Sequence, residues 1–337
     1  MSPTTSRQRT MRAVVYRAYG SADVLAIDSV EVPAAGDGDA LVRVRAAAVN
    51  PGDLYSMLGR PLAVRLATGL VAPRRRVLGR AFSGTVESVG GNVSDLEAGE
   101  DVYGEVPGGA YAEYVSVGEK LVARKPRNTT FEQAAAVPLS GVTALQGLRG
   151  RVGPGARVLI NGASGGVGTM AVQIARSLGA EVSAVCGSGS IEMVRALGAD
   201  RIVDYTRDDF THLDGYDVVF DLVGNRSLPE LRRILKPNGT LVLSSGPPSP
   251  TIRRIVKALV ISPLVRQRMR PLLATANKGD LEYLTELIEG GAVTPVIDRI
   301  FTLDEAPDAL RYQGEGHARG RTIITMPPSE PATEAPG

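Results

Sequence analysis

The fold is decided by one stretch, Asn161-Gly162-Ala163-Ser164-Gly165-Gly166-Val167-Gly168, in a chain of 337 residues. The apolar run at residues 158–160 before it is typical of a buried strand, and residues 169–178 after it have helical character. A second strand-type run follows the helix at residues 181–185. Strand, glycine-rich turn, helix and strand in this order predict a βαβ unit, the setting in which a dinucleotide fingerprint occurs.

The glycines of this turn predict nucleotide binding through the geometry of the backbone. Gly165 lets the backbone approach a pyrophosphate, Gly168 permits close packing of helix on strand, and the helix N-terminus faces the anion. Many loops use glycine only to reach a positive φ, but the order of elements around this turn favours a cofactor. The residues predicted to contact it are Ala163, Ser164, Gly165, Gly166, Val167 and Gly168.

The end of the second strand bears on the choice of cofactor. NAD sites commonly place Asp or Glu there to bond the ribose 2′-hydroxyl, whereas this chain has Cys186-Gly187-Ser188-Gly189-Ser190. Without a carboxylate a 2′-phosphate meets no repulsion, and Ser188 and Ser190 are available as donors. No Arg or Lys stands there to pair with the phosphate, and both serines are also consistent with an ordinary turn. NADPH is therefore the predicted cofactor, with NADH as the alternative.

Strand-type and helix-type segments alternate from residue 157 onward, which predicts an α/β fold with helices on both faces of a parallel sheet. Residues 257–262 are predicted as its sixth strand, and Asp280 as the N-cap of a helix that closes at Gly290. Residues 11–126 instead alternate short β-type runs with turns, which indicates a β-rich module. Strand-type runs at residues 294–301 and 321–325 are expected to rejoin that module.

Composition limits the chemistry. Cys186 is the single cysteine, and His212 and His317 are the two histidines, so a disulfide within the chain and a four-cysteine zinc site are excluded and a catalytic zinc is not expected. With 38 basic and 36 acidic residues the formal net charge is +2, which predicts no nucleic-acid partner and no membrane partner. No apolar stretch approaches the roughly 18–20 residues of a membrane span. We therefore expect a cytoplasmic protein whose polar N-terminus is a loose tail or, alternatively, a short presequence.

Further motifs extend this pattern over nearly the whole chain. They are Ala48-Val49-Asn50-Pro51-Gly52-Asp53, Val77-Leu78-Gly79, Gly84-Thr85-Val86, Ala134-Ala135-Ala136-Val137-Pro138-Leu139, Gly141-Val142-Thr143-Ala144 and Gly198-Ala199-Asp200. With the mid-chain glycine turn, they make the chain resemble the medium-chain dehydrogenase/reductase superfamily, and most closely its zinc-independent, quinone-oxidoreductase-like branch. The resemblance implies a central Rossmann domain with a doubly wound parallel sheet, residues 127–263. It also implies a GroES-like, β-rich catalytic domain formed by both chain ends, residues 1–126 and 264–337.

The metal positions of the superfamily are changed in this chain. Zinc-dependent members carry a Cys near the position of Asn50 and a Gly-His-Glu where this chain has Gly79-Arg80-Ala81. The resemblance therefore implies hydride chemistry without zinc. The chain also departs from its relatives at Ala81, where Asp is common, and near Gly189, where a basic residue is common.

The resemblance implies a set of site residues. Asn50, Asp53 and Tyr55 are expected at the nicotinamide end of the cofactor, with Thr143 close by. The residues of the loops expected to cover the cofactor are Val223, Gly224, Ser244, Ser245 and Gly246. Tyr205 matches a position that often flanks the adenosine 2′-phosphate.

Tyr55 is the predicted proton donor, because a phenol with a pKa of about 10 is protonated at pH 7. The alternative is that Tyr55 is a packing residue. Asn50 is predicted to orient the nicotinamide and Asp53 to fix the loop, although the Asn-Pro-Gly-Asp sequence is also consistent with a simple turn. The predicted function is NADPH-dependent reduction of a quinone or an α,β-unsaturated carbonyl. A zinc-free alcohol or ketone dehydrogenase and a non-enzymatic NADPH-binding protein are the alternatives.

Two basic segments complete the predictions. Cations flank the apolar run at residues 258–261, which favours an edge strand at a homodimer interface over a membrane-binding segment. Arg74-Arg75-Arg76 is predicted to be a solvated loop, with contact to an anionic substrate as the alternative. The substrate itself is predicted to be a small molecule.

Overall fold

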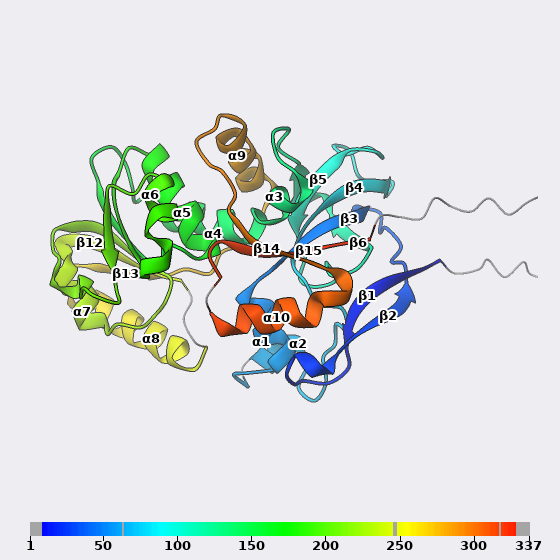
Figure 1. The fold of residues 1–337 in the computed structure, drawn as a ribbon, viewed down its shortest axis with the longest axis horizontal. Coiled ribbons are helices and arrows are strands. Elements are labelled where there is room, and N and C mark those ends of the chain that lie inside the picture. The colour runs from blue at the N-terminus through cyan, green and yellow to red at the C-terminus, as the bar shows by residue number, and fades with distance from the viewer. Residues whose placement is uncertain (1–8, 63, 245–247, 317, 328–337) are drawn as a thin grey trace, which may run out of the picture.

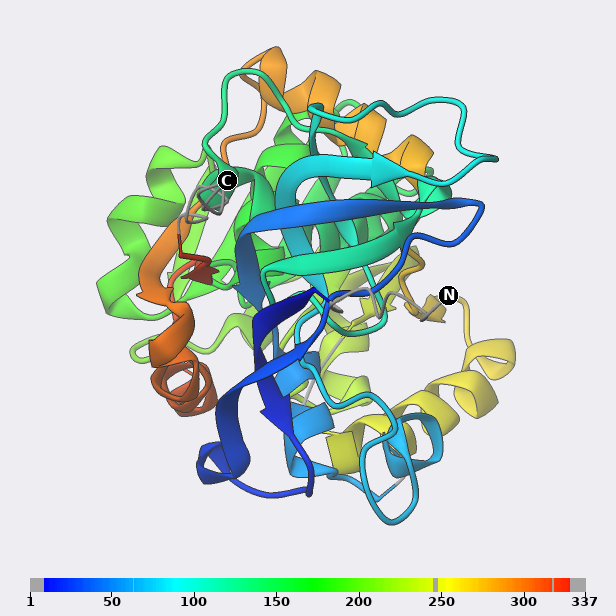
Figure 2. The same cartoon turned by 90° about the vertical axis from the view of Figure 1, so that its right-hand side faces the viewer.

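The computed structural model describes residues 9–62, 64–244, 248–316 and 318–327. Within these ranges the chain forms two large sheets at opposite ends of an elongated molecule, with helices between them (Figure 1). A hairpin of β1 (Thr10–Tyr16) and β2 (Leu25–Glu31) forms a separate antiparallel ribbon. Figure 2 looks onto the end that carries β1 and β2, with the other sheet behind it.

The first large sheet is the parallel sheet that the sequence predicts. Its strands are β8 (Arg157–Asn161), β9 (Glu181–Cys186), β10 (Arg201–Asp204), β11 (Tyr216–Asp221), β12 (Leu235–Leu243) and β13 (Arg268–Pro271). They lie in the order β10-β9-β8-β11-β12-β13, and all the pairings are parallel. The helices of this half are α4 (Pro138–Leu148), α5 (Gly166–Ser177), α6 (Ile191–Ala196), α7 (Leu228–Ile234) and α8 (Pro248–Ile261).

Alternating side chains show that helices cover both faces of this sheet. Val158 and Ile160 of β8 belong to the same buried cluster as residues of α4 and α5. Leu159, between them, packs instead in a cluster with residues of α7 and α8. Because successive side chains of a strand point to opposite faces, the sheet is doubly wound, as in a Rossmann domain.

One predicted strand of this sheet is wrong. Residues 257–261 lie in the helix α8, where Ala258 is buried and Val256, Leu259 and Val260 are exposed. The sixth strand is β13, which pairs with β12 and extends the sheet beyond residue 263. A short apolar run fits a strand and a helix equally well by periodicity, which explains the error. The edge strand at residues 258–261, on which the predicted homodimer interface depends, is therefore absent. The homodimer itself remains a prediction.

The second large sheet combines strands that follow β2 with two strands from the C-terminal part of the chain. Its strands are β3 (Asp39–Val49), β4 (Ala81–Val89), β5 (Asp101–Glu105), β6 (Tyr114–Gly118), β7 (Val122–Arg124), β14 (Ile297–Thr302) and β15 (Arg321–Thr325). They lie in the order β14-β15-β3-β4-β5-β7, with β6 also paired to β3. The pairing of β15 with β3 confirms that the C-terminal strands rejoin the N-terminal module. The other helices are α1 (Pro51–Leu58), α2 (Val64–Thr68), α3 (Phe131–Ala135), α9 (Lys278–Glu289) and α10 (Ala306–Glu315).

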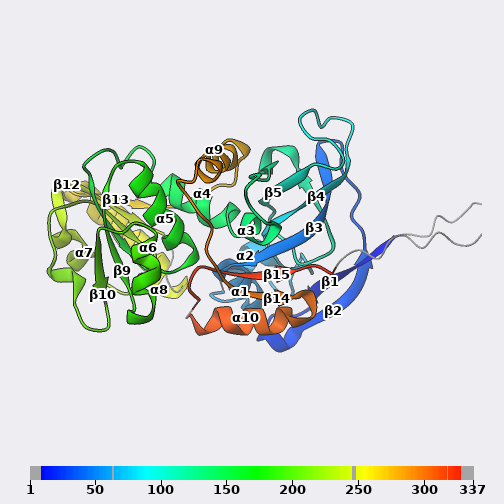
Figure 3. The same ribbon diagram turned by 45° about the horizontal axis from the view of Figure 1, so that its top comes forward.

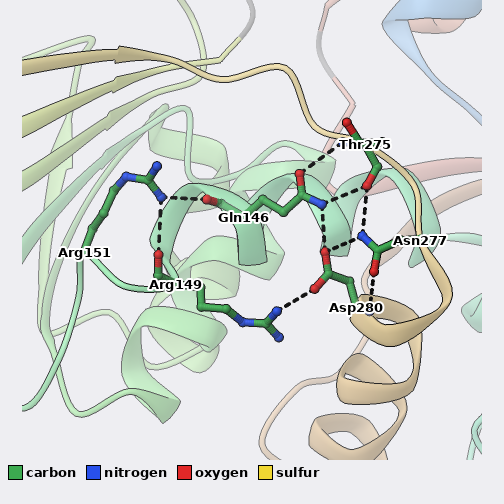
Figure 4. Close-up of polar contacts among 6 residues, drawn as sticks. All are labelled: Gln146, Arg149, Arg151, Thr275, Asn277 and Asp280. Atoms are coloured by element: carbon green, nitrogen blue, oxygen red, sulfur yellow. Dashed lines mark hydrogen bonds and ion pairs between the residues drawn. The ribbon is translucent and has the colours of Figure 1, made fainter.

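Helices α4 and α9 join the two halves of the molecule (Figure 3). The N-cap of α9 is Asn277, whose side chain accepts from the Asp280 backbone N–H, so the prediction of Asp280 as the N-cap is wrong by one turn. Asp280 has a different role, since its carboxylate accepts from Arg149 at 2.6 Å, Gln146 at 2.7 Å and Asn277 at 2.8 Å (Figure 4). Burial raises the pKa of Asp280, but these hydrogen bonds and the charge of Arg149 outweigh it and hold that pKa below its ordinary value. The Asp280 carboxylate therefore links the start of α9 to the end of α4 through hydrogen bonds and an ion pair.

Among the residues that the structure describes, no helix combines the length and the apolar character that a membrane crossing requires.

Candidate functional site

The glycine-rich turn joins the end of β8 to the first residue of α5, as the sequence predicts. A Cβ built at Gly168 would lie 2.1 Å from the carbonyl oxygen of Gly162, so only glycine lets the helix pack this closely on the turn. A Cβ built at Gly165 would meet nothing closer than 3.7 Å, so no other residue packs tightly against its Cα, although its N–H donates to the Gly162 carbonyl at 3.2 Å and it forms a bridge with Gly320. Gly165 is the N-cap of α5 and has no side chain to satisfy the first helical N–H groups. A helix start without a side-chain cap fits the pyrophosphate of a dinucleotide.

The C-terminal segment lies against this turn. The backbone N–H of Gly320 donates to the carbonyl of Ser164 at 2.8 Å. The Nε atom of Arg321 lies 2.2 Å from the position that a Cβ of Gly166 would occupy, so the guanidinium lies directly on the turn. Arg321 also donates to the Ser140 hydroxyl and, at 3.4 Å, to the carbonyl of Val49.

Arg321 is a buried cation at the positive end of a helix. Arg321 is only 4% exposed, and burial lowers the pKa of its guanidinium to about 10. In the described part of the chain its guanidinium makes no ion pair, although the charges of Asp53 and Glu105 act on it from nearby. An anion at the start of α5 would stabilise both the guanidinium and the helix dipole. The sequence interpretation did not identify Arg321, because about 155 residues separate it from the turn.

The nicotinamide-end residues come from the loop between β3 and α1. Asn50 precedes α1 and is 1% exposed; its Nδ2 donates to the Ala48 carbonyl at 2.9 Å. Its Oδ1 is buried and has no hydrogen-bond partner among the described residues. Asp53 accepts from the Asn50 backbone N–H at 3.0 Å and from the Tyr111 hydroxyl at 2.9 Å. Burial raises the pKa of Asp53 to about 6, against the lowering effect of these two hydrogen bonds.

Tyr55 lies on a different face of α1 from Asp53. Residues three apart on a helix lie on one face, so Tyr55 shares its face with Gly52. The Tyr55 side chain is half-buried, and its hydroxyl makes no hydrogen bond to any part of the chain that the structure describes. Burial raises the pKa of Tyr55, which keeps the phenol protonated. The hydroxyl is therefore available as a donor, whereas the Asp53 carboxylate is already engaged in the interior.

Arg321 donates to residues that precede Thr143 and Asn50 in the chain. Thr143 lies one turn after Ser140 on α4, and Ser140 and Val49 are both bonded to Arg321. The Thr143 hydroxyl donates to the Leu139 carbonyl at 2.6 Å, so its proton is used within the helix.

A buried carboxylate, Asp221, fixes the loop after β11 by hydrogen bonds. Asp221 is fully buried and accepts from Asn161 at 2.8 Å, from the Gly224 backbone at 3.1 Å and from Arg254 at 2.7 Å. This places Val223 over the turn, where its Cγ2 would lie 2.7 Å from a Cβ of Gly162. Ser244 follows β12 and its backbone N–H donates to the Asp221 carbonyl at 3.0 Å. The predicted contacts Ser245 and Gly246 lie outside the described residues.

The end of β9 differs in detail from the sequence prediction. The Ser188 hydroxyl donates to Asp204 at 2.5 Å, so it is not a free donor, and this hydrogen bond lowers the pKa of Asp204. Ser190 is buried within the turn, and its backbone N–H bonds the Gly187 carbonyl at 2.9 Å. The Tyr205 hydroxyl lies beside Gly187, 3.2 Å from where a Cβ would stand.

A cation does stand at this strand end, and it comes from the C-terminal segment. The Nη2 atom of Arg319 lies 2.6 Å from the position of a Cβ on Gly189. Arg319 is exposed, and within the described ranges its guanidinium has neither an ion pair nor a hydrogen bond. The interpretation that no basic residue is available here was therefore wrong, because it considered only the residues next to Gly189 in the sequence.

The metal positions named by the resemblance hold an amide and a guanidinium, at Asn50 and Arg80. A guanidinium has no lone pair to offer a metal. Within the described residues, no three His, Cys, Asp or Glu side chains come together as a ligand group.

Comparisons with known proteins agree with this architecture. Residues 36–127 match the family model of the alcohol dehydrogenase GroES-like domain, and residues 197–324 match that of zinc-binding dehydrogenases. The chain is 34% identical to the 2-methylene-furan-3-one reductase of Solanum lycopersicum, over 96% of this chain and 81% of that protein. It is also 34% identical to a chloroplastic NADPH-dependent alkenal/one oxidoreductase of Arabidopsis thaliana, over 94% and 80%.

Solved structures show the same likeness. The quinone oxidoreductase of Coxiella burnetii superposes with a TM-score of 0.82 at 29% identity, over 94% of this chain and 99% of that one. The likeness thus extends over nearly the whole chain. The chain belongs to the medium-chain dehydrogenase/reductase superfamily, among its quinone and alkenal oxidoreductases.

Proposed function

We propose that the protein is a zinc-independent, NADPH-dependent oxidoreductase that reduces the conjugated double bond of an α,β-unsaturated carbonyl or a quinone. The observation that carries the proposal is that Arg321 lies on the glycine-rich turn and also donates to the carbonyl of Val49, the residue before Asn50, in a chain whose relatives are named as reductases of this type. The amide at Asn50 and the guanidinium at Arg80 support a reaction without zinc.

The chain offers a complete set of contacts for the cofactor. The start of α5, which has no side-chain cap, would hold the pyrophosphate, with Arg321 as the nearby cation. Arg319 and Tyr205 would hold the 2′-phosphate, which supports NADPH over NADH. The unpartnered Oδ1 of Asn50 would accept from the carboxamide of the nicotinamide. When bound, NADPH supplies the hydride.

The remaining roles belong to side chains of the chain itself. Asn50 holds the orientation of the reacting ring, and its own position is fixed by Ala48 and Asp53. Tyr55 delivers the proton that completes the reduction, because its hydroxyl is protonated and free. Asp53 positions the loop and does not touch the substrate.

Turnover with a substrate panel tests the proposal. NADPH oxidation would be followed with enones, enals, quinones, saturated ketones and alcohols, and the product of a reactive enone examined by NMR after use of 4-deuterated NADPH. We expect turnover of enones or quinones with deuterium on the β-carbon of the enone. Deuterium on the carbonyl carbon would instead establish a ketone reductase, and tight NADPH binding with no turnover would establish a binding protein. Either of these results would contradict the proposal.

A further inference from the structure

Arg80 is a cation of the loop before β4 whose donors are only partly used. Its Nη2 donates to Glu105 at 2.6 Å, and this ion pair fixes the guanidinium at the end of β5. Its Nη1 lies 3.7 Å from the position of a Cβ on Gly52. Within the described part of the chain Nη1 and Nε have no hydrogen-bond partner, and Nε is buried. The side chain is 41% exposed, so part of it is accessible to a ligand.

The free edge of Arg80 faces the part of α1 that carries the predicted proton donor. Gly52 and Tyr55 lie on one face of α1, and Nη1 of Arg80 lies next to Gly52. The Asp53 carboxylate is turned inward to Tyr111 and does not neutralise this edge by direct contact. A guanidinium N–H and a phenol O–H are therefore presented on the same side of the helix.

Two other arginines near α1 already make contacts within the protein. Arg65 donates to the Gly59 carbonyl at 3.1 Å and lies over the Tyr19 ring at 4.5 Å. Arg321 is buried between Ser140 and Val49. Arg80 combines a fixed position, partial exposure and a donor without a partner, which are the requirements for binding an oxygen whose charge changes during a reaction.

We propose that Arg80 is a catalytic residue that binds the carbonyl oxygen of the substrate through Nη1; the proposal rests on the proposed function. NADPH supplies two electrons and a hydrogen nucleus to the β-carbon, and the carbon–carbon π pair shifts to make an enolate with negative charge on oxygen. The Arg80 N–H donates to that oxygen as the charge develops. The enolate then takes a proton from Tyr55 at the α-carbon and Tyr55 is reprotonated by a solvent hydronium ion, so the enone, NADPH and H₃O⁺ give the saturated carbonyl compound, NADP⁺ and water.

This role defines the substrate class. The oxygen of the substrate must reach the guanidinium while the β-carbon is held at the nicotinamide, so the double bond must be conjugated with a carbonyl. Isolated alkenes offer no acceptor to Arg80 and are not reduced. The guanidinium thus supplies positive charge at a position where zinc-dependent relatives hold a metal ligand.

Replacement of Arg80 tests the proposal. Because loss of the guanidinium alone would leave the buried Glu105 unpaired, Arg80→Gln is made both singly and with Glu105→Gln, beside Arg80→Lys and Arg80→Ala. The matched control is Arg201→Gln, an exposed arginine at the start of β10. With an enone that the wild-type protein reduces, we expect kcat/KM to fall about 100-fold in both glutamine variants while the Kd for NADPH stays within twofold. Arg80→Lys should retain more activity, and added guanidinium ion should restore part of the rate of Arg80→Ala but leave wild type unchanged.

The outcomes separate this inference from the proposed function. If wild type reduces neither enones nor quinones, both fail. If wild type is active and the double variant keeps its kcat/KM within threefold, Arg80 has no part in catalysis. A parallel loss of NADPH affinity and thermal stability, without rescue by guanidinium ion, would establish a structural role and overturn the proposal.

Discussion

Arg319 illustrates how a single residue can decide the choice of cofactor. Its guanidinium lies over Gly189 at the end of β9, beside Tyr205, and no described residue pairs with it. A charge-assisted hydrogen bond contributes about 1.5–3 kcal/mol, which corresponds to roughly 10- to 100-fold in affinity. We expect Arg319→Gln to raise the Kd for NADPH by at least about tenfold and to leave the Kd for NADH unchanged, as measured by fluorescence titration.

The control for this prediction is Arg201→Gln, which removes an exposed arginine from the start of β10, at the opposite end of the strands from Gly189. It should change neither affinity. Equal weakening of NADPH and NADH binding by Arg319→Gln would show that Arg319 acts on the shared part of the cofactor or on the loop that carries it.

Asp53 gives the folded protein a dependence on pH. Burial raises the pKa of its carboxyl from 3.8 to about 6, so the folded state binds more protons than the unfolded state between these values. The free energy of unfolding therefore falls as the pH rises through this window, by about 3 kcal/mol from this group. Asp53→Asn keeps an acceptor for Tyr111 and cannot ionise. We expect its stability relative to wild type, measured by urea unfolding, to improve by about 2.4 kcal/mol between pH 4 and pH 7.

The matched comparison is Asp304→Asn, which changes an exposed carboxylate that pairs with Arg12 on the surface. Its difference from wild type should vary little over the same range, because exposed pairs contribute at most about 1 kcal/mol. A constant difference between Asp53→Asn and wild type at all pH values would mean that the Asp53 carboxyl titrates normally.

At the scale of elements, we expect different roles for two glycines of the turn at residues 161–168: Gly168 is needed for packing and Gly165 for binding of the cofactor. A Cβ at Gly168 would overlap the Gly162 carbonyl, whereas a Cβ at Gly165 meets only ordinary contacts and its φ of −80° suits any residue. We expect Gly168→Ala to lower the free energy of unfolding by about 3 kcal/mol, since α5 must move away from β8. We expect Gly165→Ala to leave stability within about 0.5 kcal/mol but to weaken NADPH binding about tenfold, because the methyl group lies where the pyrophosphate would approach.

Gly153→Ala serves as the control, because a Cβ there meets nothing within 4 Å and its backbone is not in the left-handed region. It should change neither stability nor NADPH binding. Tight NADPH binding by Gly165→Ala would contradict the assignment of this turn to the cofactor.

Local patterns predicted the elements that their own residues determine. The turn at residues 161–168, with its strand and helix, was confirmed because glycine positions and apolar periodicity are local properties. Residues 257–262 were misassigned because a short apolar run does not distinguish strand from helix, and burial of Ala258 against the sheet decides it. Arg319 and Arg321 were missed because the fold brings them to β9 and α5 from the far end of the chain. They reach these positions because β15 pairs with β3, and no short sequence motif predicts that pairing.

At the scale of the whole molecule, a few contacts join the two halves at the proposed cofactor site. Gly320 is bonded to Ser164, and Arg321 reaches Ser140 on one side and Val49 on the other. Farther away, the Tyr103 hydroxyl donates to the Leu281 carbonyl at 2.6 Å, where α9 lies against the second large sheet (Figure 1). The first group has a buried cation at its centre and the second does not. Binding of an anionic cofactor is thus expected to strengthen the first junction and not the second.

Arg321→Met tests this coupling. In the free protein a buried guanidinium without an ion pair among the described residues carries a desolvation cost, so an apolar residue of similar length should leave the melting temperature equal or higher. At NADPH a hundredfold above the wild-type Kd, binding adds about 2.7 kcal/mol to the stability of wild type. Loss of the cation should raise the Kd by about 10- to 100-fold and reduce that gain to about 0.4–1.4 kcal/mol, measured by thermal unfolding with and without NADPH. Arg321→Lys, which keeps the charge, should retain an intermediate gain. A full gain in Arg321→Met would show that the cation at the junction does not contribute to cofactor binding.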